Sequence, residues 1–124
     1  MKMILPFPPS SNRYWRNYRG HMVKSDEART YQQEAKILAR VAGVFPVETA
    51  LVKVKLAFFR PAKRGDLDNR IKILLDALQG IAYEDDSQVK EIHAVMNDDK
   101  RNPRVEVSVC KLPLTILPLA TCTK

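Results

Sequence analysis

The chain has 124 residues, of which 45% are hydrophobic and 28% charged, a balance that excludes wholesale disorder and predicts one domain with its own core. Lys and Arg number 21 and Asp and Glu 14, and the formal net charge of +7 favours an anionic partner over charge that serves solubility alone. No apolar run reaches the roughly 18 residues of a membrane helix, and Pro6 interrupts the N-terminal apolar stretch too early for a signal peptide. Cys110 and Cys122 form no Cys-x-x-Cys pair, so the sequence predicts a reduced, cytoplasmic protein without a zinc site.

The first elements predicted in chain order are a strand, a basic loop and a helix. A short strand ends at Pro6, because proline cannot donate to a strand ladder. Residues 12–24 are predicted to form a loop, with four basic residues, three aromatic residues and no acid. Ser25 is the expected N-cap of a helix that ends near Gly43. The spacing predicts one buried helix face, made of Ala28, Tyr31, Ala35, Leu38 and Ala42.

In the second half of the chain, alternating apolar residues predict three strands, and apolar spacing of three and four predicts a second helix. The last two strands are predicted to pair as a hairpin across a turn rich in Asp, Asn and Pro. This order predicts an α+β domain in which two main helices pack on a small mixed sheet. The apolar tail 112–124 contains two prolines and is expected to dock on the domain or on a partner, or to stay loose. The elements are a strand over 51–59, a helix from Asp66 or Asp68 to Leu78, a strand over 89–96, a turn over 97–103 and a strand over 104–110.

The pattern with most chemical content is a group of acids near the start of the second helix. Asp66 and Asp68 are two residues apart, and Lys72 follows Asp68 by one helical turn. If the acidic run 84–86 folds back beside them, several carboxylates meet, and each pair ~4 Å apart repels by about 4 kcal/mol at an effective dielectric of about 20. A hard cation, Mg²⁺ or Mn²⁺, would hold such oxygen ligands together and activate water for attack on a phosphate. Carboxylates inside a basic chain therefore predict a nuclease, with Lys72 neutralising charge on the phosphate.

Each feature also has a simpler interpretation. Asp66 or Asp68 alone is most often a helix cap. Lys72 could form solvated ion pairs with Asp68 and Asp76, and the acidic run could be an ordinary soluble turn. The aromatic residues of segment 12–24 could be core anchors beside solvent-facing charges. Under these interpretations the chain would be a non-catalytic nucleic-acid-binding module, or a small interaction protein that uses its apolar tail.

Four stretches, in this order along residues 1–111, resemble the RusA-type Holliday junction resolvases, which are small bacterial and phage endonucleases. Together the central and the acidic motifs are fairly specific, whereas either alone would not be. The resemblance implies that residues 1–111 form the endonuclease domain and that the tail 112–124 has no counterpart. The stretches are Pro-Pro-Ser-Ser-Asn-Arg-Tyr-Trp-Arg at 8–16, Arg-Gly-Asp-Leu-Asp-Asn-x-x-Lys at 64–72, Asp-Ala-Leu at 76–78 and Glu-Asp-Asp-Ser-Gln-Val at 84–89.

The resemblance implies cleavage of four-way DNA junctions by a homodimer, with Mg²⁺ or Mn²⁺ as cofactor and paired nicks in opposing strands. The essential acids would be Asp66, Asp68 and Asp86, with Asp85 as a supporting metal ligand and Lys72 as the essential lysine. A two-fold dimer would match the approximate two-fold symmetry of the junction. Charge for phosphates and rings for bases mark the expected DNA contacts. These are Asn12, Arg13, Tyr14, Arg16 and Arg19 in the basic segment, and then Lys63, Arg64 and Arg70.

Overall fold

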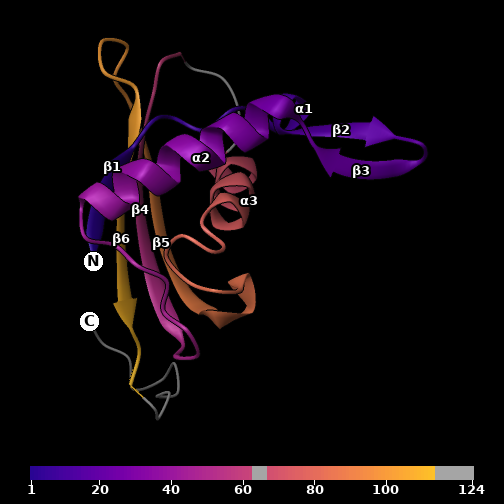
Figure 1. Cartoon of the computed structure of the whole chain (residues 1–124). Helices are drawn as coiled ribbons and strands as arrows, with labels where there is room; N and C mark the ends of the chain where they lie inside the picture. Colours follow the sequence, from indigo (N-terminus) through magenta and orange to yellow (C-terminus); the bar gives the residue numbers. More distant parts are fainter. Residues whose placement is uncertain (63–66, 114–124) are drawn as a thin grey trace.

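A computed structural model of the chain describes residues 1–62 and 67–113 as a four-stranded mixed sheet with helices packed on one face (Figure 1). The predicted α+β class, a small mixed sheet with two main helices packed on it, is confirmed. None of the described helices is long and apolar enough to cross a membrane. The elements are β1 (Lys2–Leu5), α1 (Ser11–Tyr14), β2 (Trp15–Tyr18), β3 (His21–Lys24), α2 (Asp26–Val41), β4 (Val52–Arg60), α3 (Leu67–Ala77), a 3-10 turn η1 (Asp86–Gln88), β5 (Val89–Asp98) and β6 (Arg104–Lys111).

The core lies between the sheet and the helices α2 and α3. Val54, Leu56 and Phe58 of β4 are all buried, as their alternation predicts, and they face the helices. Ser25 caps α2 as predicted, since its Oγ accepts a hydrogen bond from the Ala28 amide at 3.0 Å. The buried stripe of α2 differs from the prediction, because Leu38 and Ala42 are exposed. Steps of three, four and four keep the actual stripe closer to the 3.6-residue helical period: Ala28, Tyr31, Ala35 and Ala39.

Segment 12–24 does not form the loop that its composition predicts. It contains the short helix α1 followed by the β2–β3 hairpin, a two-stranded antiparallel unit. Tyr18 pairs with His21 across a two-residue turn, and both turn residues, Arg19 and Gly20, have positive φ angles of 52° and 81°. Positive φ at both positions is the backbone of a type I′ turn, which matches the right-handed twist of paired strands. The turn geometry therefore makes a hairpin of a segment whose composition indicated a loop.

The predicted hairpin of β5 and β6 is wrong, because β4 lies between these two strands (Figure 1). The strand order is β1-β6-β4-β5, with β5 parallel and β6 antiparallel to β4. Residues 99–103 carry the chain across the end of β4, and the Asp99 amide donates to the Arg60 carbonyl at 2.9 Å. The burial patterns explain this order: β4 is largely buried and gains from two neighbours, whereas β5 is mostly exposed and suits an edge.

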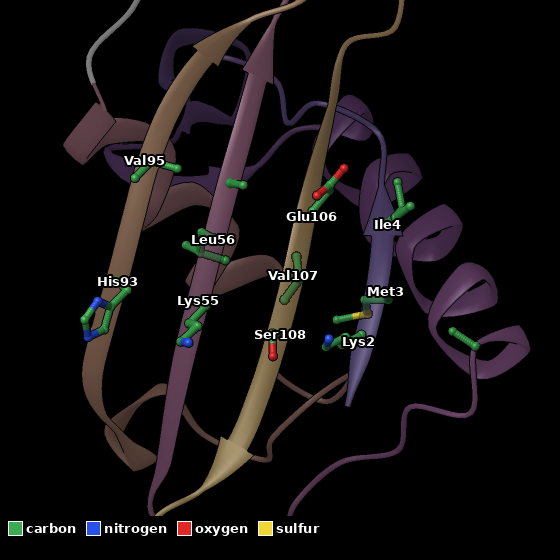
Figure 2. Close-up of a pocket in the computed structure, with 12 residues that line it drawn as sticks. Lys2, Met3, Ile4, Lys55, Leu56, His93, Val95, Glu106, Val107 and Ser108 are labelled. Carbon is green, nitrogen blue, oxygen red and sulfur yellow. The ribbon is translucent and has the colours of Figure 1, made fainter. Parts of the chain in front are cut away.

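The strand order can be tested with cysteine pairs on the uncovered face of the sheet. Lys55 is the cross-strand partner of both Ser108 and His93, and the three side chains lie in one row (Figure 2). In a chain whose Cys110 and Cys122 are replaced by serine, Lys55→Cys with Ser108→Cys should form a disulfide under mild oxidation. His93→Cys with Ser108→Cys should not, because two strand spacings amount to about 9.6 Å, beyond the ~7 Å limit for a disulfide. The readout is the mass of the oxidised chain; cross-linking of the second pair alone would contradict the order.

Candidate functional site

Helix α3 carries a row of charged residues along one side. Asp68, Lys72 and Asp76 are four residues apart and therefore lie along one face of the helix. Asp68 stands in the first turn, where a carboxylate is favoured by the helix dipole, and is exposed, as is Lys72. Neither of the simple ion pairs of Lys72, with Asp68 or with Asp76, occurs in the described part of the chain. Asp76 pairs instead with Lys24 of β3, at 3.2 Å.

The Asp76 carboxylate joins three parts of the molecule. Its Oδ2 accepts a hydrogen bond from the Tyr14 hydroxyl at 2.6 Å and lies 3.2 Å from Lys24 Nζ. Its Oδ1 accepts from Gln79 Nε2 at 3.2 Å. Burial first, and the bond to Asp76 second, raise the pKa of Tyr14, so its hydroxyl stays protonated and donates. α1, β3 and α3 are thus held at one anionic group.

The acidic turn before β5 is held by Gln88, the buried polar residue of the described chain. Gln88 Oε1 accepts hydrogen bonds from the amides of Glu84 and Asp85, both at 2.9 Å. Its Nε2 donates to the carbonyls of Val47 and Ala50 at 3.0 and 2.9 Å. These four bonds satisfy the buried amide group completely and fix the turn that presents the acids.

Gln79 connects this acidic turn to α3. Its Oε1 accepts from the Asp86 amide at 3.3 Å, while its Nε2 donates to Asp76. Tyr83 lies in the same region. Burial has the largest effect on its hydroxyl and raises the pKa, and the negative charges of Asp86, Asp76 and Asp85 raise this pKa further. The negative charges of three carboxylates are therefore felt at one group, the Tyr83 hydroxyl, near the C-terminal end of α3.

The structure brings only part of the predicted acid cluster together. Asp85 and Asp86 lie at the end of α3, whereas Asp68 precedes Asp76 by eight residues, about 12 Å along the helix axis. Asp66 lies outside the described residues. Within residues 1–62 and 67–113, no three His, Cys, Asp or Glu side chains are arranged to hold a metal ion. The donors themselves are all carboxylate oxygens, the ligands that suit Mg²⁺.

Some of the predicted DNA-contacting residues are exposed, whereas others are engaged in contacts within the protein. Asn12, Arg16 and Arg19 are exposed, and Arg13 is exposed but paired with Glu27 at 3.0 Å. The predicted DNA contact of Tyr14 is corrected, because its side chain is 0% exposed and serves as an anchor.

Arg70 is engaged within the protein. Its Nη1 donates to the Pro8 carbonyl at 3.2 Å, and its guanidinium lies 4.9 Å from the centre of the Phe7 ring. Burial lowers the pKa of this guanidinium. These contacts hold the proline-rich segment after β1 against α3, so a DNA contact by Arg70 stays a prediction. Lys63 and Arg64 lie outside the described residues.

The opposite face of the sheet does not resemble the acidic region. Its hollow is lined by β1, β6, β4 and β5, with Lys2, Lys55 and His93 among the polar side chains (Figure 2). Among the described residues that line it, the single acid is Glu106, whose Oε2 already accepts from Arg104 at 3.0 Å. The candidate site therefore belongs to the helix-covered side of the molecule.

Sequence reasoning missed the residues that position this site. Asp76 was treated as a possible ion-pair partner of Lys72, and Gln79 and Gln88 were given no role. Their bonds join segments far apart in the chain, and no local pattern indicates such bonds. The β2–β3 hairpin was also missed, because Arg19 is not one of the residues (Asn, Asp or Gly) that signal a two-residue turn with two positive φ angles.

Comparison with known proteins assigns the chain to a family. The model of the family described as Endodeoxyribonuclease RusA matches residues 6–110, and the chain belongs to this family. The chain is 32% identical over 113 residues to the crossover junction endodeoxyribonuclease RusA of Escherichia coli strain K12, covering 89% of this chain and 93% of that protein. It is 28% identical over 113 residues to the corresponding protein of Enterobacteria phage HK97, covering 90% and 94%. The resemblance stated from the motifs is thereby confirmed.

The hydrogen bonds within the acidic turn predict a pH dependence. Hydrogen bonds from Ser87 lower the pKa of Asp85. The bond from the Ser87 hydroxyl has the larger effect, and the bond from its backbone amide the smaller. Because this pKa is lowered on folding, its stabilising contribution is present above the ordinary carboxyl pKa and is lost as the pH falls through the folded value. Ser87→Ala should raise the Asp85 pKa, measured by NMR titration of its carboxyl carbon.

The same variant should be less stable than the wild type at neutral pH, and the difference should vanish in acid once Asp85 is protonated in both proteins. Urea unfolding at the two pH values measures this. Ser108→Ala, on the uncovered face of the sheet, is the control and should leave the Asp85 pKa unchanged. An unaltered Asp85 pKa in Ser87→Ala would contradict the assignment.

Proposed function

We propose that this protein is a structure-selective endonuclease that resolves four-way DNA junctions by metal-dependent hydrolysis of phosphodiester bonds. The observation that carries the proposal is the placement of acids at both ends of α3, in a chain of formal net charge +7. A basic chain attracts the DNA backbone, while acids within it are costly near phosphates unless a cation sits between them. The proposal is supported by relatives that are named crossover junction endodeoxyribonucleases.

In this proposal Asp66, Asp68 and Asp86 hold Mg²⁺, with Mn²⁺ as a substitute, and Asp85 supports them. The bound ion would activate water and neutralise charge on the attacked phosphate. The residues of this chain have separate tasks. Gln88 and Gln79 fix the turn that carries Asp85 and Asp86, and Lys72 places a cation near the phosphate whose charge grows in the transition state.

The proposal includes a homodimer. Within one chain, about two turns of α3 separate Asp68 from the acidic turn. A two-fold axis that sets two α3 helices side by side and antiparallel would bring Asp68 of one protomer close to Asp86 of its partner. Such a dimer has two equal sites, and a four-way junction has matching approximate symmetry. Paired nicks in opposing strands follow from this match.

A second candidate function is a non-catalytic module that binds nucleic acid. It is favoured by one observation, namely that no three potential ligands in the described part of a single chain are arranged around a metal position. The basic residues would then bind DNA, while the acids would serve as helix caps and turn residues. The two candidates differ in whether a divalent metal leads to strand cleavage.

A cleavage assay separates these candidates. The protein is incubated with labelled four-way junctions, linear duplex or single strands, in Mg²⁺, in Mn²⁺ or in chelator. We expect paired nicks in opposing strands of the junction alone, with either metal and not with chelator. Junction binding without nicks under every condition would contradict the endonuclease and support the non-catalytic module.

Asp68→Asn tests the acid at the start of α3. Cleavage should fall by at least the roughly 10–100-fold that is lost when partners in the outer shell of a metal are removed. Junction binding should persist or improve, because the change removes a negative charge close to phosphates. The matched control is Asp26→Asn, an exposed acid in the first turn of α2 that pairs with Arg29 at 3.4 Å, and it should cleave normally. Cleavage by Asp68→Asn at the wild-type rate would show that the assignment is wrong.

A further inference from the structure

The β2–β3 hairpin stands away from the body of the molecule. Figure 1 shows it as an arm that extends from the α1 end of the structure, beyond α3. From Arg16 to Met22 every residue is exposed, including the two turn residues. An isolated two-stranded hairpin is at best marginally stable in water, so an arm of this kind needs anchoring at its base and gains from a partner at its tip.

The tip combines apolar surface with positive charge. Tyr18 is 49% exposed, and the guanidinium groups of Arg16 and Arg19 lie 5.7 and 5.3 Å from the centre of its ring. Met22 is 65% exposed. Residues 15–24 contain three cations and no acid. An exposed ring with two guanidinium groups close to it suits nucleic acid, because a base can stack on the ring and the neighbouring phosphates can pair with the guanidinium groups. A second copy of this basic chain would meet the arm with charge of the same sign.

The base of the arm is fixed to the helix that carries the candidate acids. Trp15 packs edge-on against the buried Tyr14, with ring centres 5.0 Å apart. The Tyr14 hydroxyl, just before β2, and Lys24 Nζ, at the end of β3, both contact Asp76 Oδ2. Both ends of the hairpin thus meet one carboxylate of α3. The base of the arm is therefore anchored on the helix that also carries Asp68 and Lys72.

We propose that the β2–β3 hairpin is a wedge that enters the centre of a four-way junction, where the Tyr18 ring stacks on a base released from pairing. Arg16 and Arg19 hold the neighbouring phosphates, and Met22 fills apolar space beside the unstacked base. The inference rests on the proposed function and deepens it, because it assigns the recognition of the branch point to the hairpin. The candidate metal-binding acids then act on DNA strands that the arm has positioned.

The test compares two junctions that differ only at their centre. One is fully paired, and the other has unpaired nucleotides at the branch point, so that no wedge is needed to open it. Tyr18→Ala should cleave the paired junction at least 10-fold more slowly than the wild type and cleave the unpaired one within 2-fold of it. Tyr18→Phe should restore the paired activity, because it keeps the ring. Phe45→Ala is the matched control, since Phe45 is 59% exposed and also lies beside a guanidinium, that of Arg40 at 5.1 Å.

A second measurement does not depend on cleavage. A 2-aminopurine base placed at the branch point should gain fluorescence when the Asp68→Asn protein binds, and this gain should disappear when Tyr18→Ala is added to that variant. If Tyr18→Ala slowed cleavage of both junctions equally, or slowed cleavage of neither, the wedge proposal would be overturned. A dimer-to-monomer change in Tyr18→Ala, measured by light scattering, would also overturn it, because the arm would then bind a second copy. If the wild type cleaves neither junction while the fluorescence gain depends on Tyr18, the endonuclease proposal fails and the wedge stands.

Discussion

The structure depends on one half-buried anion, the Asp76 carboxylate. A carboxylate with 21% of its side chain exposed is costly unless partners satisfy it, and Asp76 has three: the Tyr14 hydroxyl, the Lys24 ammonium and the Gln79 amide. Each partner comes from a different segment. The need to satisfy this single charge therefore draws the hairpin base, α3 and the connection to the acidic turn into one arrangement.

This arrangement gives α3 charged residues at both of its ends. Asp68 lies at its start and Lys72 at its middle, and at its end Asp76 and Gln79 hold the turn with Asp86. Because a helix keeps its two ends at a fixed distance, Asp68 is held about two turns from Asp76, and the described acids of one chain form no cluster of three around a metal position. A second protomer is the simplest way for the proposed metal site to gain ligands from both ends, which links the proposed dimer to the proposed chemistry.

Much of the local structure follows from sequence pattern. The alternation of Val54, Leu56 and Phe58 predicted a strand with one buried face, and Ser25 predicted the start of α2. These signals are local, because side-chain periodicity and capping involve residues only a few positions apart. The strand order did not follow, since β5 and β6 are adjacent in the sequence and yet lie on either side of β4. Pairing between distant strands depends on which strand gains most from two neighbours, and a local pattern does not contain that information.

The sequence by itself determined the α+β class, the family, and the residue types from which a metal-dependent nuclease would be built. Only the tertiary structure decided that Tyr14 is a buried anchor and that Tyr18 is the ring presented to solvent, although both belong to one basic aromatic segment. The same holds for the distance between Asp68 and the acidic turn. The physical reason is that burial and distance depend on all the elements that pack around a residue, whereas its chemistry is fixed by its side chain alone.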